Sequence, residues 1–195
     1  MHYIRNLREL DNKAQSEAAR ILFEALAHAP SAWPDLTSAM DEVISFVKDD
    51  ERLALVALED GKVRGWIGGI RHSEFGWEMH PLVVDPPYQR QGWGTRLVSA
   101  LENTARNAGA ITLWLGTDDD FGGTNLYGKD LYPEVLGNLQ TLTATHGHPF
   151  TFYRRLGYFV TGVFPDVDGM GKHDILMAKR IDQHSNSGEG VPCST

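Results

Sequence analysis

The chain has 195 residues and a formal net charge of −8, from 18 Lys and Arg against 26 Asp and Glu. Its composition, 42% hydrophobic and 23% charged, is that of an ordinary globular domain and excludes a disordered or collagen-like chain. The longest apolar run covers residues 53–58, far short of a membrane span. An acidic chain also suits a cationic ligand better than a phosphate backbone. We therefore expect neither a membrane nor nucleic acid as partner.

The single cysteine, Cys193, cannot form an internal disulfide, and the first residues lack the apolar core of a secretory signal. Both features predict a cytoplasmic location. The composition becomes strongly polar from Asp182 onward. We expect a single domain over residues 1–181 and a disordered polar tail over residues 182–195.

The hydrophobic pattern predicts two helices before any strand, over residues 18–26 and 36–47. Strands are then expected over residues 53–58, 63–70 and 76–84, the first two joined by the hairpin signal Asp60-Gly61. The remaining expected elements are helices near 95–108, 135–142 and 149–157, and strands near 111–115, 158–164 and 174–178. This order predicts a mixed α/β sheet with helices on both faces.

A glycine-containing turn follows the strand that is expected to end at Val84. Gly92 and Gly94 lie at the start of the next helix, where a missing side chain lets backbone N–H groups approach a phosphate. The helix N-terminus adds roughly half a positive charge there. The end of a Walker A motif and the third glycine of a dinucleotide fingerprint are both missing. The turn therefore predicts a phosphate-binding loop of another kind, with a simple tight turn as the alternative.

The segment Gln89-x-x-Gly92-x-Gly94, between a strand and a helix, resembles the acyl-CoA pyrophosphate loop of the GNAT N-acetyltransferase superfamily. Further stretches resemble the aminoglycoside 6′-N-acetyltransferases of the enterococcal chromosomal type. These stretches are residues 76–84, 94–98, 111–119, 148–158 and 172–179. The resemblance covers about residues 53–180 and implies a GNAT fold, acetyl-CoA as acetyl donor and a homodimer. It also implies transfer to the 6′-amine of aminoglycosides, a reaction that confers antibiotic resistance.

Glu78 and His80 lie two residues apart on an expected strand, so their side chains share one face. A carboxylate and an imidazole placed in this way could hold an ammonium group and relay its proton. A polar strand face, or a histidine bonded within the core, is the structural alternative. The resemblance implies a glutamate at position 78 as base or ammonium anchor, and we rank Glu78 above His80 as proton acceptor.

The resemblance also implies which residues hold the thioester. It places the backbone N–H of Leu82 opposite the thioester carbonyl and Tyr153 near the sulfur, as candidate general acid. Pro81 lacks an N–H and is compatible with a local splay of the strand. Plain packing is the alternative for the side chains of Leu82 and Tyr153. The expected cofactor-binding residues are Leu82, Val83, Val84, Gln89, Arg90, Gln91, Gly92, Trp93, Gly94, Thr95 and Tyr153.

Three consecutive aspartates follow the strand expected at residues 111–115. Ligands usually bind at the ends of sheet strands, and carboxylates suit the ammonium groups of an aminoglycoside. Asp118 and Asp119 fit the pattern of the family, whereas a solvated loop is the alternative. Trp33 resembles an early tryptophan near the family's substrate cleft. The eight histidines show no metal-ligand spacing, so we expect no metal.

The favoured interpretation is direct acetyl transfer within a ternary complex, because no Cys/His arrangement indicates a covalent acyl-enzyme. One alternative is the same fold acting on another small amine or on a protein N-terminus. A second alternative is an acyl-CoA-binding module without turnover. Thiol release measured with a panel of acceptors would separate the three.

Overall fold

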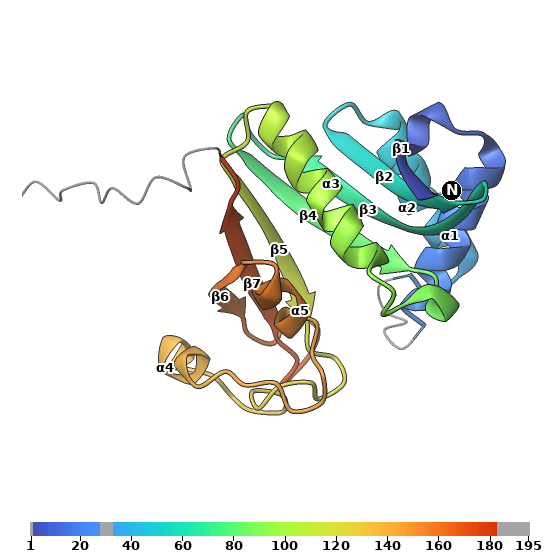
Figure 1. Ribbon diagram of the computed structural model, residues 1–195. Helices are drawn as coiled ribbons and strands as arrows, with labels where there is room; N and C mark the ends of the chain where they lie inside the picture. The colour runs from blue at the N-terminus through green and yellow to red at the C-terminus, as the bar shows by residue number, and fades with distance from the viewer. Residues whose placement is uncertain (1, 28–32, 183–195) are drawn as a thin grey trace, which may run out of the picture.

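The computed structural model describes residues 2–27 and 33–182, which form one mixed sheet with helices on both faces (Figure 1). The strands are β1 (His2–Asn6), β2 (Arg52–Glu59), β3 (Lys62–Arg71), β4 (Gly76–Val84), β5 (Thr112–Asp118), β6 (Phe159–Phe164) and β7 (Asp174–Arg180). The helices are α1 (Asn12–Ala25), α2 (Leu36–Lys48), α3 (Trp93–Asn107), α4 (Val135–Gln140) and α5 (Phe150–Arg155), with 3₁₀ turns η1 (Leu7–Glu9) and η2 (Pro86–Tyr88). Over these residues the strand order is β1-β2-β3-β4-β5-β7-β6, and β4 and β5 are the parallel neighbours. The expected fold class is confirmed.

The first element is a strand, so the expectation of two helices before any strand is wrong. β1 pairs antiparallel with β2 and forms one edge of the sheet. Its side chains are exposed or half-buried, which leaves no apolar alternation for sequence analysis to detect. α1 also begins earlier than expected, where the Asp11 side chain accepts a hydrogen bond from the N–H of Ala14 at 3.0 Å.

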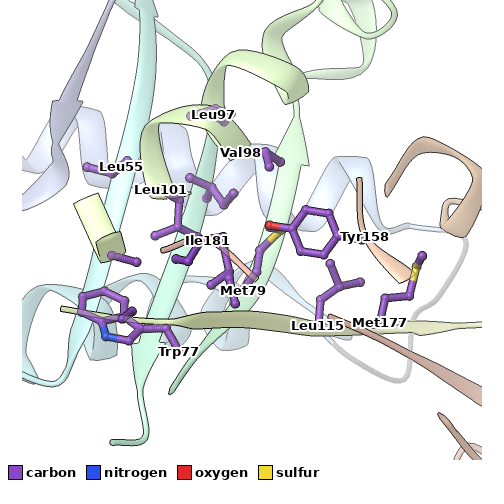
Figure 2. Packing of buried hydrophobic residues seen from close by; sticks show 14 of the residues in the cluster. Leu55, Trp77, Met79, Leu97, Val98, Leu101, Leu115, Tyr158, Met177 and Ile181 are labelled. Atoms are coloured by element: carbon purple, nitrogen blue, oxygen red, sulfur yellow. The ribbon is translucent and has the colours of Figure 1, made fainter. Parts of the chain in front are cut away.

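The sheet separates two hydrophobic cores. α1 and α2 pack on one face, where Trp66 is fully buried and donates its indole N–H to the carbonyl of Ala18 at 3.1 Å. α3 packs on the other face, where Leu97 and Leu101 meet Trp77 and other buried residues (Figure 2). Because helices cover both faces of the sheet, side chains on both sides of a strand are buried. The strand sequences are therefore nearly continuous apolar runs.

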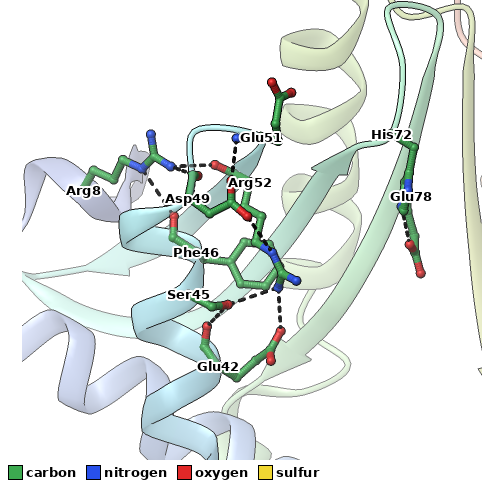
Figure 3. Close-up of polar contacts among 9 residues, drawn as sticks. All are labelled: Arg8, Glu42, Ser45, Phe46, Asp49, Glu51, Arg52, His72 and Glu78. Carbon is green, nitrogen blue, oxygen red and sulfur yellow. Dashed lines mark hydrogen bonds and ion pairs between the residues drawn. The ribbon is translucent and has the colours of Figure 1, made fainter.

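Arg8 fixes the segment after β1 to the end of α2 (Figure 3). Its guanidinium donates to the carbonyl oxygens of Phe46 at 3.3 Å, of Arg52 at 3.0 Å and of Asp49. The last carbonyls of a helix lack partners within the helix, so a cation there satisfies them. Arg8 therefore holds the β1 half of the sheet and α2 together.

β4 and β5 pair only at their beginning and then separate (Figure 1). The parallel register joins Gly76 to Thr112 and ends where Glu78 lies opposite Trp114. Beyond that point β5 continues to pair with β7, and β4 continues to pair with β3. In the described part of the chain, the separation leaves one edge of β4 without a neighbouring strand, in the middle of the sheet.

No helix among the described residues is both long and apolar enough to cross a membrane. The expected polar tail, apart from Asp182, lies outside the described residues, as does Cys193.

Candidate active site

A cavity of about 610 Å³ lies between the free edge of β4, the loop before α3, and α5. Its lining residues are Leu82, Val84, Gln89, Arg90, Gly92, Trp93, Gly94, Thr95, Pro149, Phe152, Tyr153, Arg155 and Leu156. Of the expected cofactor-binding residues, only Val83 and Gln91 do not line this cavity. The side chain of Val83 belongs to the core under α1 and α2, and the Gln91 amide donates to the carbonyl of Pro87 at 3.2 Å.

The loop before α3 has the geometry of an anion site. Gly92 is the N-cap residue of α3 and has φ +87°, the left-handed region that favours glycine. No side chain among the described residues caps this helix start, so its first N–H groups are available to a ligand. Gly94 lies against the Phe152 ring, where a Cβ would approach it to 3.4 Å. Arg90 and Arg155 add positive charge to the cavity wall.

The free edge of β4 presents two backbone N–H groups toward the cavity. The N–H of Asp85 donates to the carbonyl of Arg64 on β3 at 2.9 Å. Because bonding directions alternate along an antiparallel strand, the N–H groups of Val84 and Leu82 point away from β3. Consistent with this, the Val84 carbonyl accepts a hydrogen bond from the Gln89 side chain at 3.2 Å.

A β-bulge in β4 reverses the alternation of its side chains. Odd-numbered residues point to the α3 face before the bulge, and even-numbered residues point to that face after it. His80 and Pro81 together oppose the single residue Gly68, because Ile67 pairs with Leu82 and Gly69 with Met79. A Cβ on Gly68 would lie 2.0 Å from the His80 carbonyl oxygen, so only glycine fits opposite the bulge. Met79, before the bulge, packs into the α3 core, and so does Leu82 after it.

The bulge thus separates two groups of residues on one strand. Leu82 and Val84 face the cofactor-type cavity beside α3. On β5, on β7 and on β4 before the bulge, every second side chain packs into the α3 core. The side chains between them point to the opposite face of the sheet, which we call the open face. The open face carries Glu78, His80, Trp114, Gly116, Asp118 and Asp174.

The open face brings Glu78 and His80 together with aromatic side chains. The Nε2 atom of His72 lies 2.7 Å from a carboxylate oxygen of Glu78 (Figure 3). The His72 ring lies 5.1 Å from that of Trp114. The ring of His80 lies 5.7 Å from that of Trp33. Trp33 therefore lies beside His80 at this face, and its expected contact with substrate stays a prediction. His72 and Trp114 are further residues of the face, which the sequence did not single out.

Asp118 lies at the end of β5 in a group of carboxylates. Burial raises its pKa to about 7, and the charges of Asp174 and Asp168 act in the same direction. Burial also raises the pKa of Asp174, to which the charges of Asp168 and Glu78 contribute. Among residues 2–27 and 33–182, no Lys or Arg side chain forms an ion pair with Glu78, Asp118 or Asp174, and such a group of carboxyl side chains favours a cationic ligand.

Asp119 does not share this role, and the expectation that it binds substrate is corrected here. It is 1% exposed, and its carboxylate accepts hydrogen bonds from the N–H of Gly123 at 2.6 Å and from Thr124. The backbone N–H of Asp119 donates to the His173 carbonyl at 3.0 Å. A short carboxylate that accepts bonds from nearby N–H groups stabilises its own turn.

His148 links α5 to the end of β5 and was not expected from the sequence. It is completely buried, and its Nδ1 accepts a hydrogen bond from the N–H of Phe150 at 3.1 Å. The other ring nitrogen, Nε2, therefore carries the hydrogen and donates to the Asp118 carbonyl at 3.1 Å. Burial lowers the pKa of His148, which keeps the ring neutral.

Tyr153 lines the cavity from α5. Its ring packs edge-on against Phe152 at 5.1 Å and against Tyr158 at 5.9 Å. Burial raises the pKa of Tyr153 above its ordinary value. The phenol is therefore protonated at neutral pH and can donate a hydrogen bond into the cavity.

Within residues 2–27 and 33–182, no group of three or more His, Cys, Asp or Glu side chains could hold a metal ion.

Sequence reasoning missed several residues of the two regions. Trp114 and Asp174 could have been found, because they alternate with apolar residues along strands β5 and β7. His72 and Arg155 gave no such signal, because His72 lies in a turn and Arg155 lies on the exposed side of a short helix.

Comparison with protein families agrees with this geometry. Residues 17–131 match the acetyltransferase (GNAT) family. The chain therefore belongs to this family of acetyl-CoA-dependent acetyltransferases. A comparison with curated protein sequences finds no match.

Solved structures give more detail. The chain is 34% identical to an aminoglycoside 6′-N-acetyltransferase complexed with coenzyme A, with a TM-score of 0.82 over 92% of this chain and 97% of the other. It is also 34% identical to the aminoglycoside 6′-N-acetyltransferase from Enterococcus faecium, with a TM-score of 0.79 over the same shares. The ribosomal-protein-S18-alanine N-acetyltransferase from Escherichia coli shares the fold at 20% identity and a TM-score of 0.64, over 97% of this chain and 100% of the other.

Proposed function

We propose that the protein is an aminoglycoside 6′-N-acetyltransferase that transfers acetyl from acetyl-CoA directly to the 6′-amine of its substrate. The observation that carries this proposal is the carboxylate-rich open face, with Glu78, Asp118 and Asp174, next to the separation of β4 and β5. The similarity to aminoglycoside 6′-N-acetyltransferases over 92% of the chain supports it.

Acetyl-CoA would bind in the cavity beside α3. Its diphosphate would accept hydrogen bonds from the first N–H groups of α3 at Gly92 to Gly94, assisted by Arg90. Its pantetheine arm would extend along the free edge of β4, where the N–H groups of Leu82 and Val84 take the place of a missing strand. This arrangement directs the thioester toward the bulge in β4, which lies between Leu82 at the cavity and Glu78 on the open face.

The acceptor amine must lose a proton before it can attack. An alkylamine has a pKa near 10, so at pH 7 its neutral form costs about 4 kcal/mol. Glu78 would hold the ammonium group and accept its proton. The amine nitrogen would then bond to the thioester carbon, and the N–H of Leu82 would stabilise the negative charge that forms on the carbonyl oxygen.

The tetrahedral intermediate would then expel the thiolate of coenzyme A. A thiol has a pKa of about 8.5, below that of Tyr153, whose pKa burial raises. Complete proton transfer from the phenol to the sulfur is therefore uphill. We accordingly assign to Tyr153 a hydrogen bond to the departing sulfur, in preference to the role of full general acid.

We also propose that the enzyme acts in the cytoplasm and protects its cell from aminoglycosides. Acetylation removes the positive charge of the 6′-amine, and with it one of the ammonium contacts that a polyanionic target would use.

The exposed edge strand β6 supports the proposed homodimer. β6 is the outermost strand of the described sheet, and Phe159 and Phe164 are 74% and 55% exposed. An apolar edge strand favours pairing with another strand. We expect Phe159→Lys to convert a dimer into a monomer in sedimentation velocity, while Leu36→Lys, at an exposed leucine at the start of α2, leaves the dimer intact. A wild-type protein that sediments as a monomer would contradict the proposal.

The substrate proposal is tested by thiol release from acetyl-CoA in the presence of different acceptors. Kanamycin carries a 6′-amine, whereas paromomycin carries a 6′-hydroxyl. We expect rapid thiol release with kanamycin and little with paromomycin. Equal release with both, or release only with polyamines or peptides, would show that another amine is the substrate, and no release with any acceptor would indicate a binding module.

A further inference from the structure

His72 occupies a defined position beside Glu78, although it lies in the turn between β3 and β4. Its backbone N–H donates to the carbonyl of Gly76 at 3.2 Å, and the N–H of Gly76 donates to the Ser73 hydroxyl at 3.0 Å. The ring of His72 lies against that of Trp114 at 5.1 Å. Backbone and ring contacts together place the imidazole over the Glu78 carboxylate (Figure 3).

The 2.7 Å distance between His72 Nε2 and Glu78 Oε2 requires a proton between the two atoms. Since a carboxylate only accepts, the hydrogen is carried by Nε2 of the imidazole. One oxygen of Glu78 is then occupied by His72, and the second oxygen is left for another donor. The Glu78 side chain is 29% exposed, so a ligand on the open face can reach it.

We propose that His72 is a positioning residue that anchors one oxygen of Glu78, directs the other toward the acceptor ammonium, and weakens acceptor binding when its ring becomes protonated. This inference rests on the proposed function. It assigns the pH dependence of acceptor recognition to the His72–Glu78 pair. A neutral His72 leaves the pair with a charge of −1, which attracts an ammonium group. An imidazolium cancels that charge and competes with the substrate for the same carboxylate.

The groups around this pair determine the expected pH profile. β4 contributes Glu78 and β5 contributes the uncharged Trp114, while the charge of Asp174 on β7 acts on the same region. Burial raises the pKa of Asp118 to about 7. Acceptor recognition in the wild type therefore depends on the charge of the His72–Glu78 pair and on the charge of Asp118.

Two substitutions separate these contributions. His72→Gln keeps an N–H at the position of Nε2 but cannot become charged, so Glu78 stays anchored. His72→Phe keeps the ring beside Trp114 but removes the hydrogen bond. His146→Gln is the matched control, because His146 is an exposed histidine whose ring contacts the carbonyl of Gly122.

The experiment is the pH dependence of kcat/KM for kanamycin, with KM for acetyl-CoA measured in parallel. Between pH 8 and pH 5.5, log kcat/KM should fall with a steeper slope in the wild type and His146→Gln than in His72→Gln. At pH 8, His72→Gln should stay within about threefold of the wild type and His72→Phe should lose about tenfold, the equivalent of one lost hydrogen bond. KM for acetyl-CoA should not change. The same slope in wild type and His72→Gln, or full activity in His72→Phe, would overturn the proposal.

Failure of the proposed function is a different result. If the wild type releases no thiol with kanamycin, calorimetric binding of kanamycin at pH 5.5 and pH 8 decides the role of His72. Weaker binding at pH 5.5, with a smaller pH effect in His72→Gln, supports the positioning role. An equal pH effect in both proteins, or no binding at either pH, overturns it.

Discussion

Asp118 and Asp174 lie directly opposite each other on the neighbouring strands β5 and β7. The two carboxyl groups interact, and Gly116 leaves the space that the Asp174 carboxylate occupies, since a Cβ there would lie 2.3 Å from it. Two like charges this close destabilise the ionised protein. The pair therefore lowers the stability of the free protein and at the same time attracts a cation.

This relationship predicts that Asp118→Asn stabilises the protein above neutral pH. The pKa of Asp118 is raised to about 7, so its contribution to stability is fully present below the unfolded-state pKa near 4 and is lost as the pH rises through 7. Asparagine resembles the protonated form at every pH. We expect Tm to rise by about 2–4 °C at pH 8, equivalent to about 1 kcal/mol after solvent screening, and by less at pH 5.

The same variant should bind kanamycin more weakly, because an ammonium contact is lost. Thermal unfolding and calorimetry on one preparation check both effects. An unchanged Tm at pH 8, together with unchanged kanamycin affinity, would contradict the role assigned to Asp118.

Glu78→Gln tests the proton acceptor. Glutamine keeps the size of the side chain but cannot take a proton, so kcat for kanamycin should fall by about a hundredfold or more. In the proposed arrangement acetyl-CoA binds on the other face of β4, so its affinity should be unchanged. Glu74→Gln, at an exposed glutamate in the adjacent turn, serves as control. Equal losses of kcat and of acetyl-CoA affinity would argue against Glu78 as base.

Gly92→Ala and Gly61→Ala form a matched pair for the cofactor loop. Both glycines have positive φ, +87° and +77°, and a Cβ at either position meets no atom within 4 Å. Each substitution should therefore cost about 1 kcal/mol of stability through backbone strain. Only Gly92→Ala should raise KM for acetyl-CoA, because only Gly92 lies at the start of α3. A similar KM in both variants would show that this turn does not hold the diphosphate.

Because His148 is buried, we expect the stability of the folded protein to depend on pH. The pKa of His148 is lowered by burial, so its contribution is fully present above the unfolded-state pKa near 6.5 and is lost as the pH falls through the folded-state value. His148→Asn retains an acceptor at the position of Nδ1, and His148→Gln retains a donor at the position of Nε2. Both variants should unfold at lower temperature than the wild type at pH 7.5, with a smaller difference at pH 5. A constant difference across this range would contradict the assignment.

Much of the fold follows from local patterns. The strands that become β2 to β5 and the amphipathic α3 were predictable because each buries apolar residues at a regular period. The same holds for the loop at Gly92, since the positive φ at this helix start favours a residue without a Cβ. β1 was not predictable, because an exposed edge strand has no apolar period.

The site was harder to predict than the fold. Asp118 and Asp119 are neighbours with the same side chain, and only the end of β5 and the turn after it decide that Asp118 lies on the open face and Asp119 is buried. The bulge at His80 likewise depends on the register between β3 and β4, which the sequence of one strand does not contain.

The central claim is that β4 presents acetyl-CoA on one side of its bulge and the acceptor amine on the other. A crystal structure of the protein with coenzyme A and kanamycin tests it most directly. We predict the diphosphate on the N–H groups at Gly92 to Gly94, the sulfur within hydrogen-bonding distance of Tyr153, and the 6′-amine at Glu78. Coenzyme A bound outside the cavity beside α3, or a 6′-amine directed away from Glu78, would contradict the account.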